Sequence, residues 1–88
     1  MNTVKEIALS IASELKEHPE HWGQIYFHHN GKSCLAGHLR RRMGDDYDQY
    51  NLTPFYDAVD GSITRWNDAP QRTVQDVIAL CEKVAQHG

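Results

Sequence analysis

Cys34 is the residue whose type and position most directly suggest covalent chemistry. A helix is predicted to begin beside it, and the free backbone N–H groups at a helix start stabilise a thiolate. Gln24 lies ten residues upstream, where its side-chain amide could donate a hydrogen bond to an oxyanion. The pattern fits a small cysteine-dependent enzyme. The pattern fits better a small buried side chain where a strand and a helix touch.

A nucleophilic cysteine also needs a general base, and four histidines are candidates. His28, His29 and His38 are near Cys34 in the sequence, whereas His87 is far downstream. His38 would lie one helical turn from Cys34. The sequence does not decide among these bases, so the enzyme remains an alternative hypothesis.

Metal binding is the second chemistry that the histidines could support. Cys34 and His38 are four residues apart and could face one ion, with a third ligand from the two histidines that precede them. His18 and His21 form the other close pair, but Pro19 between them argues against two ligands on one helix face. We therefore expect no metal and no other cofactor.

Arginines and tyrosines in the middle of the chain form the strongest binding pattern. The predicted binding residues are Arg40, Arg41, Arg42, Tyr47, Tyr50 and Tyr56. Arginine and tyrosine are enriched at the energetic centres of protein interfaces. Consecutive side chains fan around a helix, so at most two of the arginines can face one partner. This segment is predicted to bind another protein.

The same arginines allow two other interpretations. Asp45, Asp46 and Asp48 follow them closely and could neutralise them in an internal charge network. Alternatively, the arginines could bind nucleic acid while the neighbouring tyrosines stack on bases. A net charge of −3 speaks against nucleic-acid binding as the main activity.

The composition predicts one small globular domain, residues 1–88. Hydrophobic residues make up 40% of the chain and charged residues 24%, which are ordinary values for a folded protein. No apolar run reaches the length of a membrane span, and the first residues do not resemble a signal peptide. Two cysteines are too few for a disulfide scaffold. We expect a cytoplasmic protein with no membrane partner.

Two long helices at the ends of the chain are predicted with the clearest signals. Thr3 with Glu6 and Thr73 with Asp76 have the spacing of a helix-starting capping box. An apolar stripe with helical spacing follows each start. The first stripe is Val4, Ile7, Ala8, Ile11, Ala12 and Leu15, and the second is Val74, Val77, Ile78, Cys81, Val84 and Ala85.

The middle of the chain is predicted to hold shorter elements. We expect a helix over 34–43 that ends at Gly44, a loop over 45–50, a short helix that is capped by Thr53 and closed by Gly61, and one more turn after Ser62. Residues 24–28 and 32–34 are predicted to pair as a β-hairpin around Asn30 and Gly31. The expected fold class is therefore α+β, mostly helical, with three to four helices around one core.

Three short motifs together resemble a functionally uncharacterised family of small proteins from actinobacteria and bacteriophages. The motifs are Trp22-Gly23-Gln24, Cys34-x-x-Gly37-x-Leu39, and Trp66-Asn67-Asp68 with Thr73-x-x-Asp76-Val77. From the residues alone, we expect Trp66 in the core and Asn67 and Asp68 bonded to their own turn. The resemblance itself implies a viral or mobile-element origin.

A non-enzymatic protein-interaction module is the predicted function. No phosphate-binding glycine loop or zinc-protease motif occurs, which removes the commonest enzyme classes. With the resemblance, the prediction becomes an accessory protein that binds and inhibits a host protein. A homodimer remains an open alternative.

Overall fold

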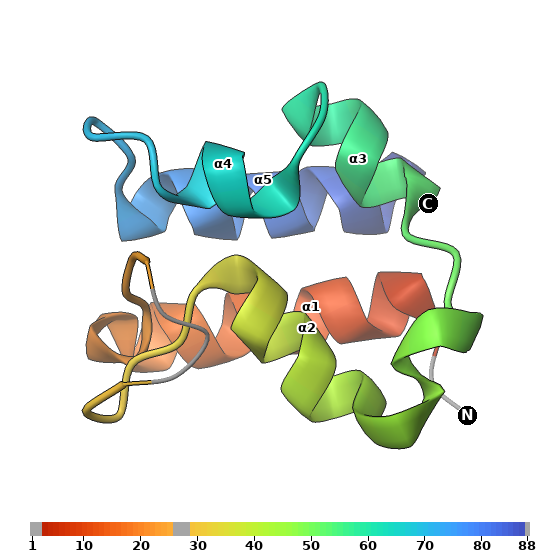
Figure 1. The fold of residues 1–88 in the computed structure, drawn as a ribbon, viewed down its shortest axis with the longest axis horizontal. Coiled ribbons are helices and arrows are strands. Elements are labelled where there is room, and N and C mark those ends of the chain that lie inside the picture. The colour runs from red at the N-terminus through yellow and green to blue at the C-terminus, as the bar shows by residue number, and fades with distance from the viewer. Residues whose placement is uncertain (1–2, 26–28, 88) are drawn as a thin grey trace.

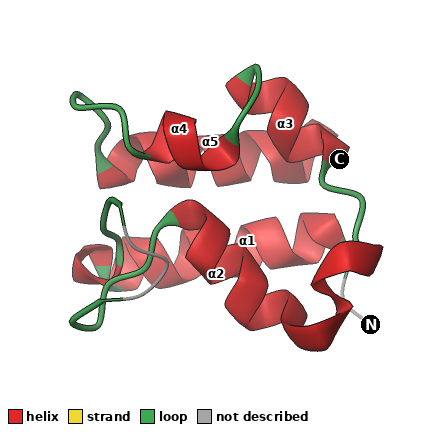
Figure 2. Cartoon of the chain, viewed as in Figure 1, coloured by secondary structure: helices red, strands yellow, loops and turns green. Residues whose placement is uncertain are grey.

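The computed structural model describes residues 3–25 and 29–87, which fold into two layers of helices (Figure 1). The helices are α1 (Val4–Glu17), η1 (Pro19–His21), α2 (Leu35–Met43), η2 (Gly44–Gln49), α3 (Thr53–Val59), α4 (Ile63–Asn67) and α5 (Val74–His87), where η marks a 3₁₀-helix. One layer holds α1 and α2, and the other holds α3, α4 and α5. The described residues contain no β-strand (Figure 2).

Helices α1 and α5 run roughly antiparallel and form the centre of the core (Figure 1). Both predicted capping boxes are confirmed, with Thr3 and Glu6 at the start of α1 and Thr73 and Asp76 at the start of α5. Both apolar stripes are buried, except that the first valine of each is only partly covered. Burying one such aliphatic side chain contributes about 1.5–3 kcal/mol, so this contact supplies much of the fold's stability.

Helix α2 packs against α1 in its own layer and against α4 in the other, and its position follows from its apolar face. Leu35, Leu39 and Met43 are spaced by four residues and are all buried in the core. Gly44 ends the helix as predicted, with the positive φ of +58° that favours glycine. Helix α2 therefore holds its first residues inside the molecule and its last turn near the surface.

The segment after α2 differs from the sequence prediction. Residues 45–50 were expected to form a loop, but η2 covers most of them. A 3₁₀-helix needs only backbone hydrogen bonds between residues three apart. It therefore leaves no apolar periodicity in the sequence from which it could be predicted. Helix α3 then begins at Thr53 itself, so the prediction that Thr53 caps it is wrong; Leu52 occupies the capping position without a side-chain hydrogen bond. The Asn51 side chain accepts a hydrogen bond from the Thr53 N–H at 3.1 Å.

The predicted β-hairpin is wrong, and the fold is helical rather than α+β. The tight turn itself is present, because Asn30 and Gly31 have φ of +53° and +79°. His29 and Lys32 exchange backbone hydrogen bonds of 2.8 and 3.0 Å across it. This pairing is an isolated bridge and does not extend into strands among the described residues.

Tertiary hydrogen bonds explain why the first predicted strand fails to form. Ile25 has φ +79°, which is incompatible with a strand. Its N–H donates to Oδ1 of Asp68 at 2.8 Å, near the end of α4. The segment is thus bonded to a distant helix end instead of to a neighbouring strand. Residues 26–28 of the predicted strand lie outside the described residues.

Candidate functional site

Arg40 and Tyr47 meet where α2 gives way to η2. The guanidinium carbon of Arg40 lies 4.9 Å from the centre of the Tyr47 ring, which is a cation–π contact. Arg40 is exposed and Tyr47 is half-buried. The contact arises because Gly44 redirects the chain immediately after the last turn of α2. It holds an arginine and an aromatic ring together at the surface.

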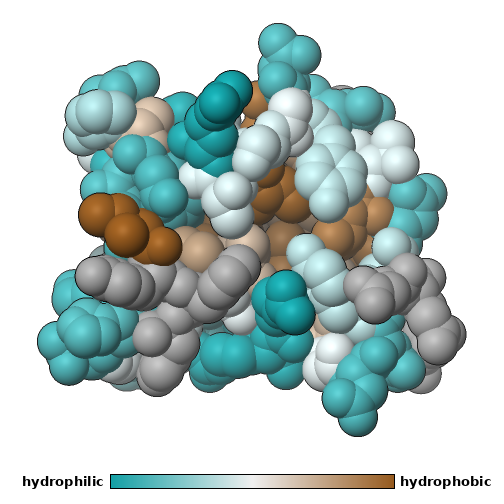
Figure 3. Space-filling model, in the orientation of Figure 1, coloured by the Kyte–Doolittle hydropathy of each residue, from teal (hydrophilic) through white to brown (hydrophobic). Residues whose placement is uncertain are grey.

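Tyrosines from η2, the following loop and α3 gather around this pair. Tyr47 and Tyr56 line two neighbouring hollows of about 250 and 310 Å³. Arg40 and Ile63 line the first hollow, and Tyr50 lines the second. Hydrophobic residues are visible between the two helix layers on the face that Figure 3 shows. We call Arg40, Tyr47, Tyr50 and Tyr56 the Arg–Tyr face.

The structure separates the three consecutive arginines. Arg40 and Arg41 are exposed, but the side chain of Arg42 is only 17% exposed and turns toward α1. Its Nη2 atom lies 2.6 Å from Oε1 of Glu14, and its Nε donates to Oγ of Ser10 at 3.0 Å. Arg42 is therefore part of an internal ion pair, whereas Arg40 and Arg41 remain at the surface.

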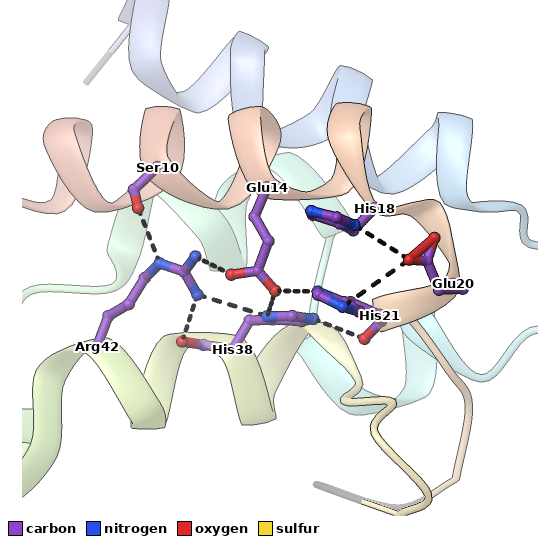
Figure 4. A network of polar contacts seen from close by, with 7 residues as sticks. All are labelled: Ser10, Glu14, His18, Glu20, His21, His38 and Arg42. Carbon is purple, nitrogen blue, oxygen red and sulfur yellow. Dashed lines mark hydrogen bonds and ion pairs between the residues drawn. The ribbon is translucent and has the colours of Figure 1, made fainter.

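Glu14 is the centre of a polar network between α1, η1 and α2 (Figure 4). One carboxylate oxygen pairs with Arg42, and the other accepts a hydrogen bond from Nδ1 of His21 at 3.0 Å. Burial alone would raise the pKa of Glu14. The hydrogen bonds from Arg42 and His21 and the nearby positive charge outweigh burial and lower the pKa to about 2. Glu14 is therefore ionised at neutral pH.

His38 is fully buried beside this network and is held in its neutral form. Its Nε2 donates to the backbone oxygen of His21 at 3.1 Å, since a carbonyl can only accept. Its Nδ1 lies 3.4 Å from Nη1 of Arg42 and can accept from it. Burial lowers the pKa of His38. The buried imidazole thus links two backbone segments rather than serving as a base for a nucleophile.

The surroundings of Cys34 do not activate its thiol. The residue caps α2, and its Sγ accepts a hydrogen bond from the Gly37 N–H at 3.4 Å. Cys34 is only 3% exposed, and burial raises the pKa of its thiol. The Gln24 amide donates to the backbone oxygens of Asn67 and Ala69 at 3.0 and 2.8 Å, so its donors are already used. The geometry favours a buried structural cysteine.

Both thiols are expected to react slowly with alkylating reagents in the folded protein. Burial raises the pKa of Cys34 and raises that of Cys81 to about 12, so little thiolate forms near neutral pH. Mass spectrometry of iodoacetamide labelling, with and without urea, would measure both rates. Unfolding should increase them strongly, by a comparable factor. Fast labelling of Cys34 alone in the folded protein would revive the cysteine-enzyme hypothesis.

Asn67 joins the three motifs that the sequence singled out. It is fully buried, and its Oδ1 accepts hydrogen bonds from the Trp22 indole at 2.6 Å and from the Leu35 N–H at 3.0 Å. Its Nδ2 donates to the backbone oxygen of Gly23 at 3.1 Å and to Asp68. The prediction that Asn67 bonds to the backbone of its own turn is therefore wrong, because only its bond to the Asp68 side chain lies within the turn.

Trp66 packs against the core but is only partly buried. The guanidinium carbon of Arg72 lies 4.0 Å from the centre of its indole ring and covers it. Trp66 was expected in the core, and it packs against the core from the edge, whereas the asparagine that follows it is fully buried. A buried asparagine leaves no periodic signal, so the sequence offered no way to find it.

The potential metal ligands that cluster in the structure differ from those that the sequence suggested. Among the described residues, the one group of metal-ligating side chains is His18, Glu20 and His21, whose donor atoms lie within 4.8 Å of one another. The predicted pair of Cys34 and His38 does not belong to such a group. His28 lies outside the described residues, as does the side chain of His87. Sequence reasoning dismissed His18 and His21 because of the proline between them.

The fold and these contacts define a small helical protein with a charged and aromatic surface and a buried polar network. Residues 2–87 match a family of unknown function, DUF6197, and the chain belongs to that family. No curated protein and no solved structure matches the chain. Within its described part, no helix is both long enough and apolar enough to cross a bilayer.

Proposed function

We propose that this protein is a non-enzymatic interaction module that binds another protein through the Arg–Tyr face. The observation that carries the proposal is the convergence of Arg40, Tyr47, Tyr50 and Tyr56 around two adjoining hollows. Helices α2, η2 and α3 and the loop after η2 supply these residues. Arginine and tyrosine side chains at the edge of shallow hollows are typical of interface centres.

The chemistry of the face suggests what the partner presents. Arg40 and the neighbouring Arg41 favour a carboxylate on the partner, because guanidinium groups bind carboxylates in a planar, two-bond arrangement. The tyrosine rings and Ile63 favour an apolar or aromatic side chain that fills the first hollow. We therefore propose a partner segment that carries an acidic residue next to an apolar anchor.

The biological setting is a finer part of the proposal. The motif resemblance supports an origin in a bacteriophage or another mobile element. We propose that binding at the Arg–Tyr face inhibits a host protein in the cytoplasm.

Charge reversal at the face is expected to remove the partner. Immobilised protein should capture a stoichiometric partner from host lysate at low salt, and both Arg40→Glu and Tyr56→Ala should weaken this capture at least about tenfold. Lys32→Glu is the matched control, because Lys32 is exposed in the Asn30–Gly31 turn and undergoes the same charge change. Melting temperatures of all variants should remain near that of the wild type.

The same experiment separates the alternative functions. Capture that survives both substitutions would contradict the proposed surface. If the immobilised protein captured nucleic acid instead of a protein, and if this capture weakened steeply with salt concentration, the arginines would be favoured as a phosphate-binding site. Equal loss with Lys32→Glu would show a general charge effect and would also contradict a specific face.

A further inference from the structure

The turn between α1 and the middle of the chain places two histidines and a glutamate side by side. Pro19 starts η1, and a 3₁₀-helix has three residues per turn, so residues three apart lie on the same side. His18 and His21 are therefore neighbours, with ring centres 4.7 Å apart and planes 14° from parallel. The proline that argued against a helical pair is the residue that creates this one.

Glu20 faces both imidazoles with a single carboxylate oxygen. Its Oε2 lies 3.2 Å from Nδ1 of His18 and 3.9 Å from Nε2 of His21 (Figure 4). The three side chains are between 39% and 62% exposed, so they can adjust without disturbing the core. Ligands around a tetrahedral zinc ion stand about 3.3 Å apart, since Zn–N and Zn–O bonds are about 2.0–2.2 Å. The donor atoms of the three side chains lie within 4.8 Å of one another, so the exposed imidazoles would rotate out of their stacked arrangement to bring them to that spacing.

Glu14 supplies an independent feature that is typical of metal-binding histidines. Its carboxylate accepts the hydrogen bond from Nδ1 of His21 at 3.0 Å and is itself fixed by the ion pair with Arg42. This bond places the proton of a neutral His21 on Nδ1 and leaves the lone pair on Nε2, which is the atom that faces Glu20. Histidines that bind metals almost always donate their other N–H to a carboxylate or carbonyl in this way.

We propose that His18, Glu20 and His21 bind a zinc ion through two nitrogens and one oxygen, with Glu14 orienting His21. Two imidazoles and one carboxylate suit Zn²⁺, whereas Mg²⁺ and Ca²⁺ prefer oxygen ligands alone. Three protein ligands leave a fourth coordination position for water or for a donor atom of a partner. This proposal does not rest on the Arg–Tyr face, because η1 and η2 lie at opposite ends of the longest axis (Figure 1).

Calorimetric titration of the full chain, prepared without a histidine tag, with zinc chloride tests the site. We expect one ion per chain, no heat from magnesium chloride, and at least about tenfold weaker zinc binding in both His18→Ala and Glu20→Gln. His29→Ala is the matched control, because His29 is also exposed but belongs to a different turn. Its zinc affinity should equal that of the wild type. Absent zinc binding, or equal loss in all three variants, would overturn the proposal.

Nuclear magnetic resonance tests the role of Glu14 separately. In long-range proton–nitrogen spectra, zinc should shift Nε2 of His21 while Nδ1 keeps its proton, and His38 should be unaffected. Because this measurement uses the wild-type protein, it does not depend on any variant folding. Zinc attached to Nδ1 of His21, or shifts at His38 in place of His18, would overturn the assigned geometry.

Discussion

Replacing Asn67 with alanine is expected to lower the free energy of unfolding by about 3 kcal/mol. The substitution leaves the Trp22 indole, the Leu35 N–H and the Gly23 carbonyl without their partner. Each buried polar group that loses its hydrogen bond costs about 1–3 kcal/mol, and the more accessible ones regain part of this from water. In a domain of this size, the melting temperature should fall by about 12–24 °C.

Two further variants make this prediction specific. Asn67→Asp keeps one oxygen as an acceptor but replaces the Nδ2 donor with a second oxygen, which would face the Gly23 carbonyl and the Asp68 carboxylate. It should therefore destabilise the protein as well. Asn51→Ala removes only one exposed hydrogen bond, to the first N–H of α3, and should cost about 1 kcal/mol. Urea unfolding would compare them, and an Asn67→Ala loss no larger than that of Asn51→Ala would contradict the central role of Asn67.

Acidification is expected to destabilise the protein through Glu14. Its pKa is about 2 in the folded state and 4.5 when unperturbed, so the unfolded chain takes up the proton first as the pH falls. Glu14 therefore stabilises the fold fully above about pH 5, and this contribution is lost between pH 4.5 and 2. The shift corresponds to a free energy on the order of 3 kcal/mol. Urea unfolding at a series of pH values would measure it.

A pair of glutamate variants isolates this contribution. Glu14→Gln should be less stable than the wild type at neutral pH and should show a weaker loss of stability between pH 4.5 and 2. Glu17→Gln changes an exposed carboxylate on the same helix and should leave the wild-type pH profile intact. If Glu14→Gln retained the wild-type profile, the Arg42 and His21 contacts would not be the cause.

His38 adds a second, earlier pH effect in the same direction. Burial lowers its folded pKa below the unperturbed value of 6.5, so the unfolded chain binds this proton more readily. The fold therefore loses stability as the pH falls below about 6.5, before Glu14 begins to titrate. Acid unfolding should consequently begin with His38 and continue with Glu14.

The long helices could be predicted from the sequence because their signals are local. A capping box is complete within four residues. An apolar stripe with helical spacing indicates both that a helix forms and which of its faces is buried. The helix over 34–43 and its glycine end were predictable for the same reason. The hairpin prediction failed because Ile25 bonds to Asp68, which lies 43 positions away. No local pattern reports such a contact.

Some residues of the candidate site could likewise be predicted from the sequence, and others could not. Composition alone indicated Arg40, Tyr47, Tyr50 and Tyr56, and the fold brings these residues together. Composition could not show that Arg42 turns inward, because its partner Glu14 lies 28 positions earlier on another helix. The histidine and glutamate cluster was missed for a different reason. The spacing of His18 and His21 was visible in the sequence, but the 3₁₀-turn that brings the two side chains together was not predicted.

The packing of α1 against α5 has a consequence for synthesis of the chain. The apolar stripe of α1 has emerged by Leu15, but the facing stripe of α5 begins at Val74, roughly 60 residues later. At typical translation rates of about 5–20 residues per second, this delay lasts about 3–12 s. During that interval the first helix can contact η1 and α2 but lacks α5, against which it packs most extensively. Nascent chains should therefore bind hydrophobic-surface chaperones through residues 4–15 until the last helix is made.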